Sequence, residues 1–186
     1  MTKTQLTERL ESNPIIAAVH EAGFAAALES PTEVIFCLKT NILNIGEYVE
    51  RAHAKGKAIF IHIDLADGVG RDRAGLAYLA ALGVDGIIST RTQLIRAARE
   101  LGLLSVQRFF ALDSQGLESI AETLSGASPD LAEIMPGVIG KAIARFASGE
   151  TPVIAGGLIE TKKEVLSALE HGAIAVSTGK QELWYV

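Results

Sequence analysis

Eight short apolar segments recur along the sequence, and stretches with the apolar spacing of a helix lie between them. The segments are continuously apolar rather than alternating, which is typical of parallel strands buried on both faces. They occupy residues 15–19, 34–38, 58–63, 86–89, 103–109, 131–135, 153–155 and 174–176. Strands that alternate with helices predict an α/β fold, and eight such repeats predict a TIM-type (βα)8 barrel.

The repeat is short for a barrel of this kind. The 186 residues divided among eight units leave about 23 residues for each, whereas such barrels typically have about 250 residues in all. We therefore expect a compact barrel with trimmed helices and a short final helix, preceded by a lead-in helix over residues 2–13. Because no linker or low-complexity segment interrupts the repeat, residues 1–186 are predicted to form one (βα)8 barrel domain.

Composition limits the classes of function. The net charge of −5 excludes a nucleic-acid binder that acts through bulk charge, although a local basic patch is compatible with it. No apolar run approaches the length of about 18 residues that a membrane span needs, and the N-terminus has no signal-peptide pattern. We therefore expect a cytoplasmic protein without a membrane partner. The lone Cys37 lies in an apolar run and is expected to be a buried free thiol.

Two turns near the C-terminus predict an anion site. Residues 152–157 (PVIAGG) and 173–179 (AIAVSTG) are apolar runs that end in glycine or small hydroxyl residues, with about one helix between them. The loops after strands 7 and 8 commonly hold phosphate in barrels, because glycine lets the backbone approach and free N–H groups attract an anion. Ordinary turn chemistry is the alternative. The predicted phosphate ligands are Gly156, Gly157, Ser177, Thr178 and Gly179.

Polar residues also gather at the carboxyl ends of the predicted strands, where the sites of barrels lie. Charges inside a barrel are costly unless they are paired or used. The residues expected to line a pocket for the polar groups of a ligand are His62, Asp64, Arg91, Gln107, Glu133 and Gly137.

Several of these residues have alternative roles. His62 and Asp64 are two positions apart, so both are expected on the same side of their strand, in a pocket or in a structural hydrogen bond. Arg91 could bind an anion or form an ion pair with Asp64 or Glu133. No metal site is predicted, because no cysteine and no third histidine complete a ligand set. No other cofactor is expected.

A catalytic residue is not assigned. Gln107 and Arg108 must face opposite sides of their strand, so only one of them can face the barrel interior. Glu133 could act as a general base, as a hydroxyl acceptor or as the partner of an arginine. The strand ends offer neither a pair of carboxylates nor an obvious Schiff-base lysine, since Lys39 is the only lysine close to one.

Six motifs follow one another in order and with suitable spacing. They are HIDL at 62–65 with a glycine at 68, GIISTR at 86–91, QRF at 107–109, EIMPG at 133–137, AGG at 155–157, and AVST at 175–178 with LW at 183–184. Together they resemble the glycerol-3-phosphate-responsive antiterminator family, and the resemblance runs from about residue 15 to residue 184.

The resemblance implies a barrel that binds glycerol 3-phosphate and regulates genes of glycerol catabolism. It implies action on the leader mRNA of those genes, where the liganded protein prevents transcription termination. The ligand would favour the RNA-competent state by ordering loops at the barrel mouth or an interface between copies of the chain. No covalent chemistry is required for this, and no catalytic residue is implied.

The RNA-binding surface is not evident from the sequence. Three basic clusters are candidates, although such a cluster is more often a solvated helix face, so RNA binding rests on the resemblance and not on these residues. They are Arg91, Arg96 and Arg99; Arg51, Lys55 and Lys57; and Arg71 and Arg73. Two other functions stay open: an enzyme that acts on a phosphorylated glycerol-like metabolite, and a ligand-binding barrel that works through a protein partner.

Overall fold

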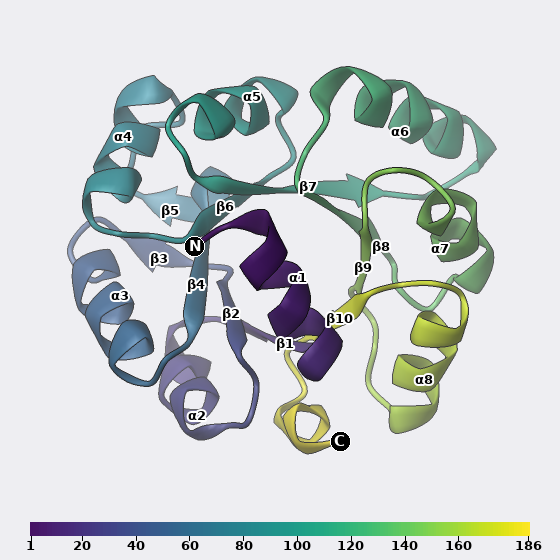
Figure 1. Cartoon of the computed structure of the whole chain (residues 1–186), viewed down its shortest axis with the longest axis horizontal. Coiled ribbons are helices and arrows are strands. Elements are labelled where there is room, and N and C mark those ends of the chain that lie inside the picture. The colour runs from purple at the N-terminus through teal and green to yellow at the C-terminus, as the bar shows by residue number, and fades with distance from the viewer.

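The computed structural model describes residues 1–186 and contains a closed barrel of parallel strands (Figure 1). The order around the barrel is β1-β10-β9-β8-β7-β6-β4-β2. These strands are β1 (Ile15–Val19), β2 (Val34–Cys37), β4 (Ala58–His62), β6 (Gly86–Ser89), β7 (Leu104–Phe110), β8 (Leu131–Met135), β9 (Val153–Gly156) and β10 (Ala175–Thr178). The predicted TIM-type barrel is confirmed, and every predicted strand end lies within about two residues of the observed one.

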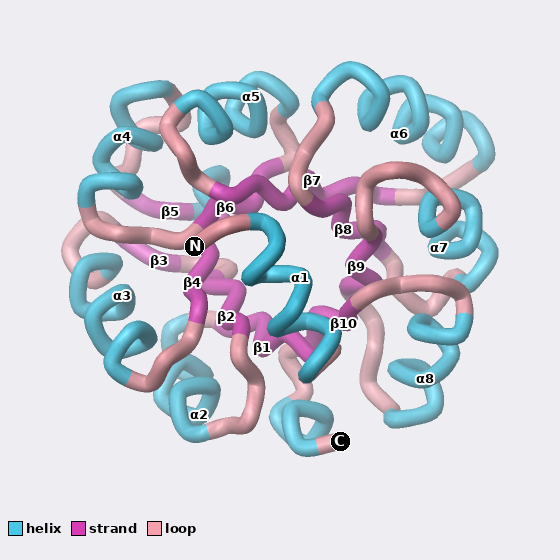
Figure 2. Tube along the Cα trace, viewed as in Figure 1, coloured by secondary structure: helices cyan, strands magenta, loops and turns pink.

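Helices form a ring outside the barrel (Figure 2). They are α2 (Phe24–Glu29), α3 (Ile45–Ala54), α4 (Arg73–Ala81), α5 (Thr92–Glu100), α6 (Ser114–Ala127), α7 (Gly140–Ala147) and α8 (Lys162–Glu170). The ring is trimmed as expected, because α2 has only six residues. The final helix is a five-residue 3-10 turn, η3 (Gln181–Tyr185).

The N-terminal helix α1 (Lys3–Ser12) closes one end of the barrel, and Figure 1 shows it lying across that opening. Its Leu6 and Leu10 are almost fully buried and join the apolar core inside the strands. The sequence predicted this helix but not its position. Because α1 covers the amino ends of the strands, the carboxyl ends form the open mouth.

Two apolar cores explain why the strands lack alternation. A cluster of 42 buried residues fills the space between the strands and the surrounding helices. A second cluster of 13 buried residues fills the barrel interior. Each strand therefore contributes apolar side chains to both faces. Cys37 is buried as a free thiol in the outer cluster, and burial raises its pKa to about 12.

Two short elements were not predicted. The strands β3 (Thr40–Asn41) and β5 (Ala66–Asp67) pair in parallel as a separate two-stranded sheet. A 3-10 turn, η2 (Ile63–Leu65), joins β4 to β5. Runs of two residues are too short to produce a recognisable pattern of hydrophobicity. None of the helices has the combination of length and apolarity needed to cross a lipid bilayer.

Candidate functional site

A buried ion pair lies inside the barrel just below its mouth. Arg108 on β7 and Glu133 on β8 are direct register partners on neighbouring strands. The Arg108 Nε donates to Glu133 Oε2 across 2.5 Å, and the Glu133 side chain is fully buried. Val106 and Leu131, two residues earlier on the same strands, belong to the interior core, so the two-residue period of a strand directs this pair inward. A charge pair at this depth is stable only when it is well hydrogen-bonded.

Ser177 on β10 completes the hydrogen bonding of that carboxylate. Its Oγ donates to Glu133 Oε1 across 2.5 Å, although β9 lies between the two strands. Gly156 on β9 leaves room for this bond, since a Cβ there would lie 2.5 Å from Glu133 Oε1 and 2.7 Å from Ser177 Oγ. Glycine at position 156 is therefore required by close approach.

A cavity of about 340 Å3 opens above this cluster at the mouth. Its polar floor includes Arg108, Glu133 and Ser177, and its walls come from the loops that follow β9 and β10. The remaining lining residues are Ala18, Leu38, Met135, Gly157, Leu158, Ile159, Glu160, Thr178, Gly179 and Lys180. The cavity thus combines a fixed polar floor with walls made largely of backbone.

Free backbone donors line the cavity wall. The N–H groups of Gly157, Leu158 and Gly179 donate to no other group of the chain. Gly157 and Leu158 both have positive φ, 75° and 60°, which turns this loop sharply after β9. Lys180 adds a cationic side chain to the same cavity. Unpaired N–H groups beside an ammonium group form an environment suited to an anion.

The two hydroxyl groups predicted as phosphate ligands already have partners. Ser177 donates to Glu133, as described above. The Thr178 Oγ1 donates to the carbonyl oxygen of Ile159 across 2.9 Å and accepts from the N–H of Lys180 across 3.1 Å. The first of these bonds joins the end of β10 to the loop after β9. Both hydroxyls therefore shape the cavity, and the donors left for an anion are backbone N–H groups and Lys180.

His62, the last residue of β4, is buried and its Nδ1 has no hydrogen-bond partner. Burial and the nearby Arg108 guanidinium lower the pKa of His62 to about 4, against opposing effects of Asp64 and Glu133. His62 is therefore a neutral imidazole at pH 7. It does not line the mouth cavity.

Asp64 and Arg91 lie together but outside the mouth cavity. Asp64 belongs to the 3-10 turn η2 rather than to a strand. The alternation of side chains along β4 therefore ends at His62 and does not extend to Asp64. Its carboxylate accepts from Ser89 Oγ at 3.0 Å and from the N–H of Thr90 at 2.8 Å. Arg91 Nε lies 3.6 Å from Asp64 Oδ1, and the Arg91 side chain is half exposed. The ion pair offered as the alternative role of Arg91 is the one observed.

The structure contradicts a pocket-lining position for Gln107. Its side chain leaves the strand on the outer face, where Nε2 donates to Thr92 Oγ1 of α5 across 3.0 Å. Arg108 is the neighbour that faces inward. Both faces of the run from 103 to 109 mix apolar and polar residues, so alternation alone could not assign the inward residue. The register of β7 against β8, which places Arg108 opposite Glu133, is what identifies the inward residue.

Gly137 supports the mouth without lining the cavity. Its N–H donates to the carbonyl oxygens of Gly156 and Gly157, at 2.6 and 3.1 Å. A Cβ at Gly137 would lie 2.8 Å from the Gly156 nitrogen. Gly137 therefore holds the loop after β8 against the end of β9. Lys180 and Leu158 were missed by the sequence analysis, although each directly follows a predicted glycine turn.

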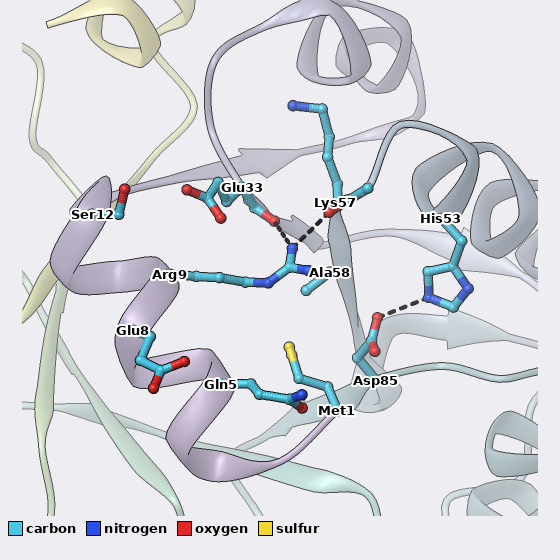
Figure 3. Close-up of a pocket in the computed structure, with 11 residues that line it drawn as sticks. Met1, Gln5, Glu8, Arg9, Ser12, Glu33, His53, Lys57, Ala58 and Asp85 are labelled. Carbon is cyan, nitrogen blue, oxygen red and sulfur yellow. Dashed lines mark hydrogen bonds and ion pairs between the residues drawn. The ribbon is translucent and has the colours of Figure 1, made fainter.

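A larger hollow, of about 560 Å3, lies at the opposite end of the barrel beside α1 (Figure 3). Most of its charged side chains form hydrogen bonds with other groups of the chain. Arg9 Nη1 donates to the carbonyl oxygen of Gly56 at 2.7 Å, and His53 Nε2 lies 3.0 Å from Asp85 Oδ2. The Lys57 ammonium donates to the carbonyl oxygens of Ser30 and Thr32. This hollow is thus a structural junction, and the candidate site is the mouth.

The mouth has the chemistry of a binding site for a small polar anion. Backbone donors and Lys180 suit a phosphate, while the carboxylate of Glu133 and the guanidinium of Arg108 suit hydroxyl groups. Lys39, the one lysine near a predicted strand end, lines a separate hollow with His20 and Asp67. No group of three or more His, Cys, Asp or Glu side chains is arranged to hold a metal ion.

Comparisons with known proteins agree with this (βα)8 architecture. Residues 15–184 match the family described as glycerol-3-phosphate responsive antiterminator. The chain is similar to the crystal structure of a glycerol uptake operon antiterminator regulatory protein from Listeria monocytogenes, with 34% identity, a TM-score of 0.87, and coverage of 92% of this chain and 95% of that one. The chain belongs to the glycerol-3-phosphate responsive antiterminator family.

Two further relatives are similar over nearly their whole length. A glycerol uptake operon antiterminator-related protein from Thermotoga maritima has 31% identity and a TM-score of 0.82, with coverage of 91% of this chain and 96% of that one. The uncharacterized protein YgcP of Escherichia coli (strain K12) is 33% identical over 182 residues, which covers 96% of this chain and 95% of that protein.

Proposed function

We propose that the protein senses glycerol 3-phosphate and, when it is bound, acts on the leader mRNA of glycerol catabolism genes as a transcription antiterminator. Membership of the family supports this proposal. The observation that carries it is the mouth cavity, in which free backbone N–H groups and Lys180 adjoin a buried cluster of Arg108, Glu133 and Ser177. Action on nascent transcripts would place the protein in the cytoplasm.

In the proposed complex, the phosphate group lies on the loops after β9 and β10. It accepts from the N–H groups of Gly157, Leu158 and Gly179 and pairs with Lys180. The glycerol end points to the floor, where Glu133 accepts from a hydroxyl and Arg108 donates to one. A volume of about 340 Å3 lies at the small end of ligand pockets, which suits a three-carbon phosphate.

Sensing requires an element whose equilibrium the ligand can shift. The loop after β9 is the candidate, because Leu158 has a φ of 60° and an exposed side chain. A non-glycine residue in this region costs about 1 kcal/mol or more. A phosphate bound to the N–H groups of this loop would favour the strained conformation over relaxed ones. An interface between copies of the chain is the other element that the ligand could bias.

The test is RNA affinity with and without ligand. Binding of a fluorescent leader transcript from a glycerol catabolism operon of the source organism would be measured by anisotropy, with glycerol 3-phosphate and separately with glycerol. We expect glycerol 3-phosphate to tighten binding at least about tenfold, which corresponds to a coupling free energy of about 1.4 kcal/mol, and glycerol to have little effect. Equal affinity with and without saturating glycerol 3-phosphate would contradict the proposal.

One observation favours a second candidate, an enzyme acting on a phosphorylated glycerol-like metabolite. A carboxylate and a hydroxyl, on Glu133 and Ser177, both line the cavity. Glu133 could in principle accept a proton from a bound substrate, but its two oxygens are already engaged by Arg108 and Ser177. NMR of glycerol 3-phosphate and dihydroxyacetone phosphate, incubated with the protein with and without divalent metals, distinguishes the candidates. Turnover that is lost in Glu133→Gln would favour the enzyme.

A further inference from the structure

A groove of about 610 Å3, separate from the mouth cavity, lies between the start of α1 and the helices α5, α6 and α7. These three helices are consecutive around the barrel (Figure 1). Three cations line the groove, and each comes from a different helix: Lys3 from α1, Arg99 from α5 and Arg145 from α7. All three are exposed. They lie far apart in the sequence, so no basic run indicated that they would meet.

These three cations have no partner within the chain. No hydrogen bond or ion pair involves the side chains of Lys3, Arg99 or Arg145. Arg145 makes a cation–π contact instead, since its guanidinium lies over the ring of the adjacent Phe146 at 6.0 Å from the ring centroid. An unpaired cation keeps its full charge for an external anion.

The basic clusters visible in the sequence are, in contrast, largely engaged. Arg91 pairs with Asp64, and Arg96 donates to the carbonyl oxygen of Gly126 at 2.8 Å. Three further members of these clusters form ion pairs within the chain: Arg51 with Glu47, Lys55 with Glu29, and Arg73 with Glu100. Of the cluster at 91, 96 and 99, only Arg99 is free, and it is the member that lines the groove.

Acidic groups in the groove only partly offset its cations. Asp130 and Glu150 also line it. The Asp130 carboxylate is occupied, since Oδ2 accepts from the N–H and the Oγ of Ser105 at 2.9 and 2.8 Å. Hydrogen bonds from these neutral groups leave the negative charge of Asp130 in place, so the groove has three cations against two carboxylates and a net charge of +1. Hydroxyl groups of Ser128, Ser148 and Thr151 add neutral hydrogen-bonding groups to the same surface.

We infer that this groove binds the phosphate backbone of single-stranded RNA. The inference rests on the proposed function and names the surface through which it would work. Convergent cations with adjacent hydroxyl groups suit a chain of phosphodiesters, which they contact without reading bases. The groove lies near the amino ends of the strands and the ligand cavity at their carboxyl ends, so RNA and glycerol 3-phosphate would not compete.

Helix α1 links the two sites physically. It contributes Lys3 to the groove and inserts Leu6 and Leu10 into the interior core. That core also contains Ile154 and Ala175, which precede Gly156 and Ser177 by two residues on the same strands. A shift at the mouth could therefore reach α1 through packed side chains.

The test compares two triple variants with equal loss of charge. The groove variant is Lys3→Gln, Arg99→Gln and Arg145→Gln. The control is Lys141→Gln, Lys162→Gln and Lys163→Gln, three exposed cations outside the groove. The probe is a fluorescein-labelled 20-nucleotide single-stranded RNA, titrated in saturating glycerol 3-phosphate at several KCl concentrations. Melting temperature and calorimetry with glycerol 3-phosphate report on the fold and the ligand site.

We expect the groove variant to bind the RNA at least about tenfold more weakly than wild type, and the control to stay within about threefold. Removal of three phosphate contacts should also reduce the slope of log affinity against log salt by about 2. Equal losses in the two variants, or wild-type affinity in a folded groove variant, would overturn the inference alone. Absence of RNA binding by wild type that still binds glycerol 3-phosphate would overturn the RNA part of the proposed function as well.

Discussion

Ser177 on β10 donates a hydrogen bond to Glu133 on β8, and the bond passes over Gly156 of the intervening strand β9. Three neighbouring strands thus contribute to one contact, which orients the carboxylate that also holds Arg108. The floor of the mouth cavity depends on the absence of a side chain at position 156.

Gly156→Ala is expected to displace the Glu133 carboxylate or the Ser177 hydroxyl, because the new Cβ would lie 2.5 and 2.7 Å from their oxygens. Affinity for glycerol 3-phosphate should fall at least about tenfold, or about 1.4 kcal/mol, as measured by calorimetry. Gly46→Ala is the matched control. Its Cβ would meet only Leu82 Cδ2, at 3.7 Å, so affinity should be unchanged. Equal affinities in the two variants would contradict the role of Gly156.

Glu133→Gln is expected to leave the buried Arg108 guanidinium without its counter-charge. Removal of one partner from a buried ion pair lowers the free energy of unfolding by about 3–5 kcal/mol, which urea denaturation would measure. The double variant Glu133→Gln with Arg108→Gln removes the unpaired charge and should regain part of that loss. A single variant as stable as wild type would show that the pair has no structural importance.

Stability should fall between pH 7 and pH 5 because of His62. Its pKa is about 4 in the folded protein, below the value of about 6.5 in an unfolded chain. The unfolded state therefore binds more protons as the pH falls through 6.5, and the loss is complete only below pH 4. The expected decrease from pH 7 to pH 5 is about 2 kcal/mol. His62→Gln should lack this component, so the two proteins must differ in pH dependence if the account is right.

Lys180→Gln is expected to weaken glycerol 3-phosphate binding about tenfold, because it removes a cation from the cavity wall. The residual affinity should depend less on salt than that of wild type. Lys163→Gln is the control, since Lys163 is an exposed cation outside the cavity. Calorimetry at two salt concentrations measures both effects. Comparable losses in the two variants would mean that only the overall charge matters.

The barrel itself was predictable because burial on both faces leaves an unmistakable pattern. Apolar runs such as 34–38 have no polar face, and the structure confirms them as barrel strands. Because both faces are buried, the sequence does not show whether an individual side chain points into the barrel or toward the helices. In the run from 103 to 109, Gln107 and Arg108 are both surrounded by apolar residues, so only the register against β8 reveals that Arg108 faces Glu133.

Local backbone geometry limited the prediction of the site. A period of two predicts that Asp64 lies on the same side as His62, but the strand ends at His62 and a 3-10 turn directs Asp64 to residues 89–90 at the end of β6. The groove cations Arg99 and Arg145 come from α5 and α7 of the helix ring, and Lys3 joins them because α1 folds back across the barrel end. Such long-range convergence leaves no signal in the sequence.

The most direct test of the central claim is calorimetry of the wild-type protein with glycerol 3-phosphate, beside glycerol and inorganic phosphate. The account predicts binding of glycerol 3-phosphate in the micromolar range, about −8 kcal/mol, and much weaker binding of the other two compounds. Because neither fragment can contact both the cavity floor and the loops, their affinities should not approach that of the whole ligand. The absence of binding heat with all three, together with an unchanged melting temperature, would contradict the assignment of the mouth as the ligand site.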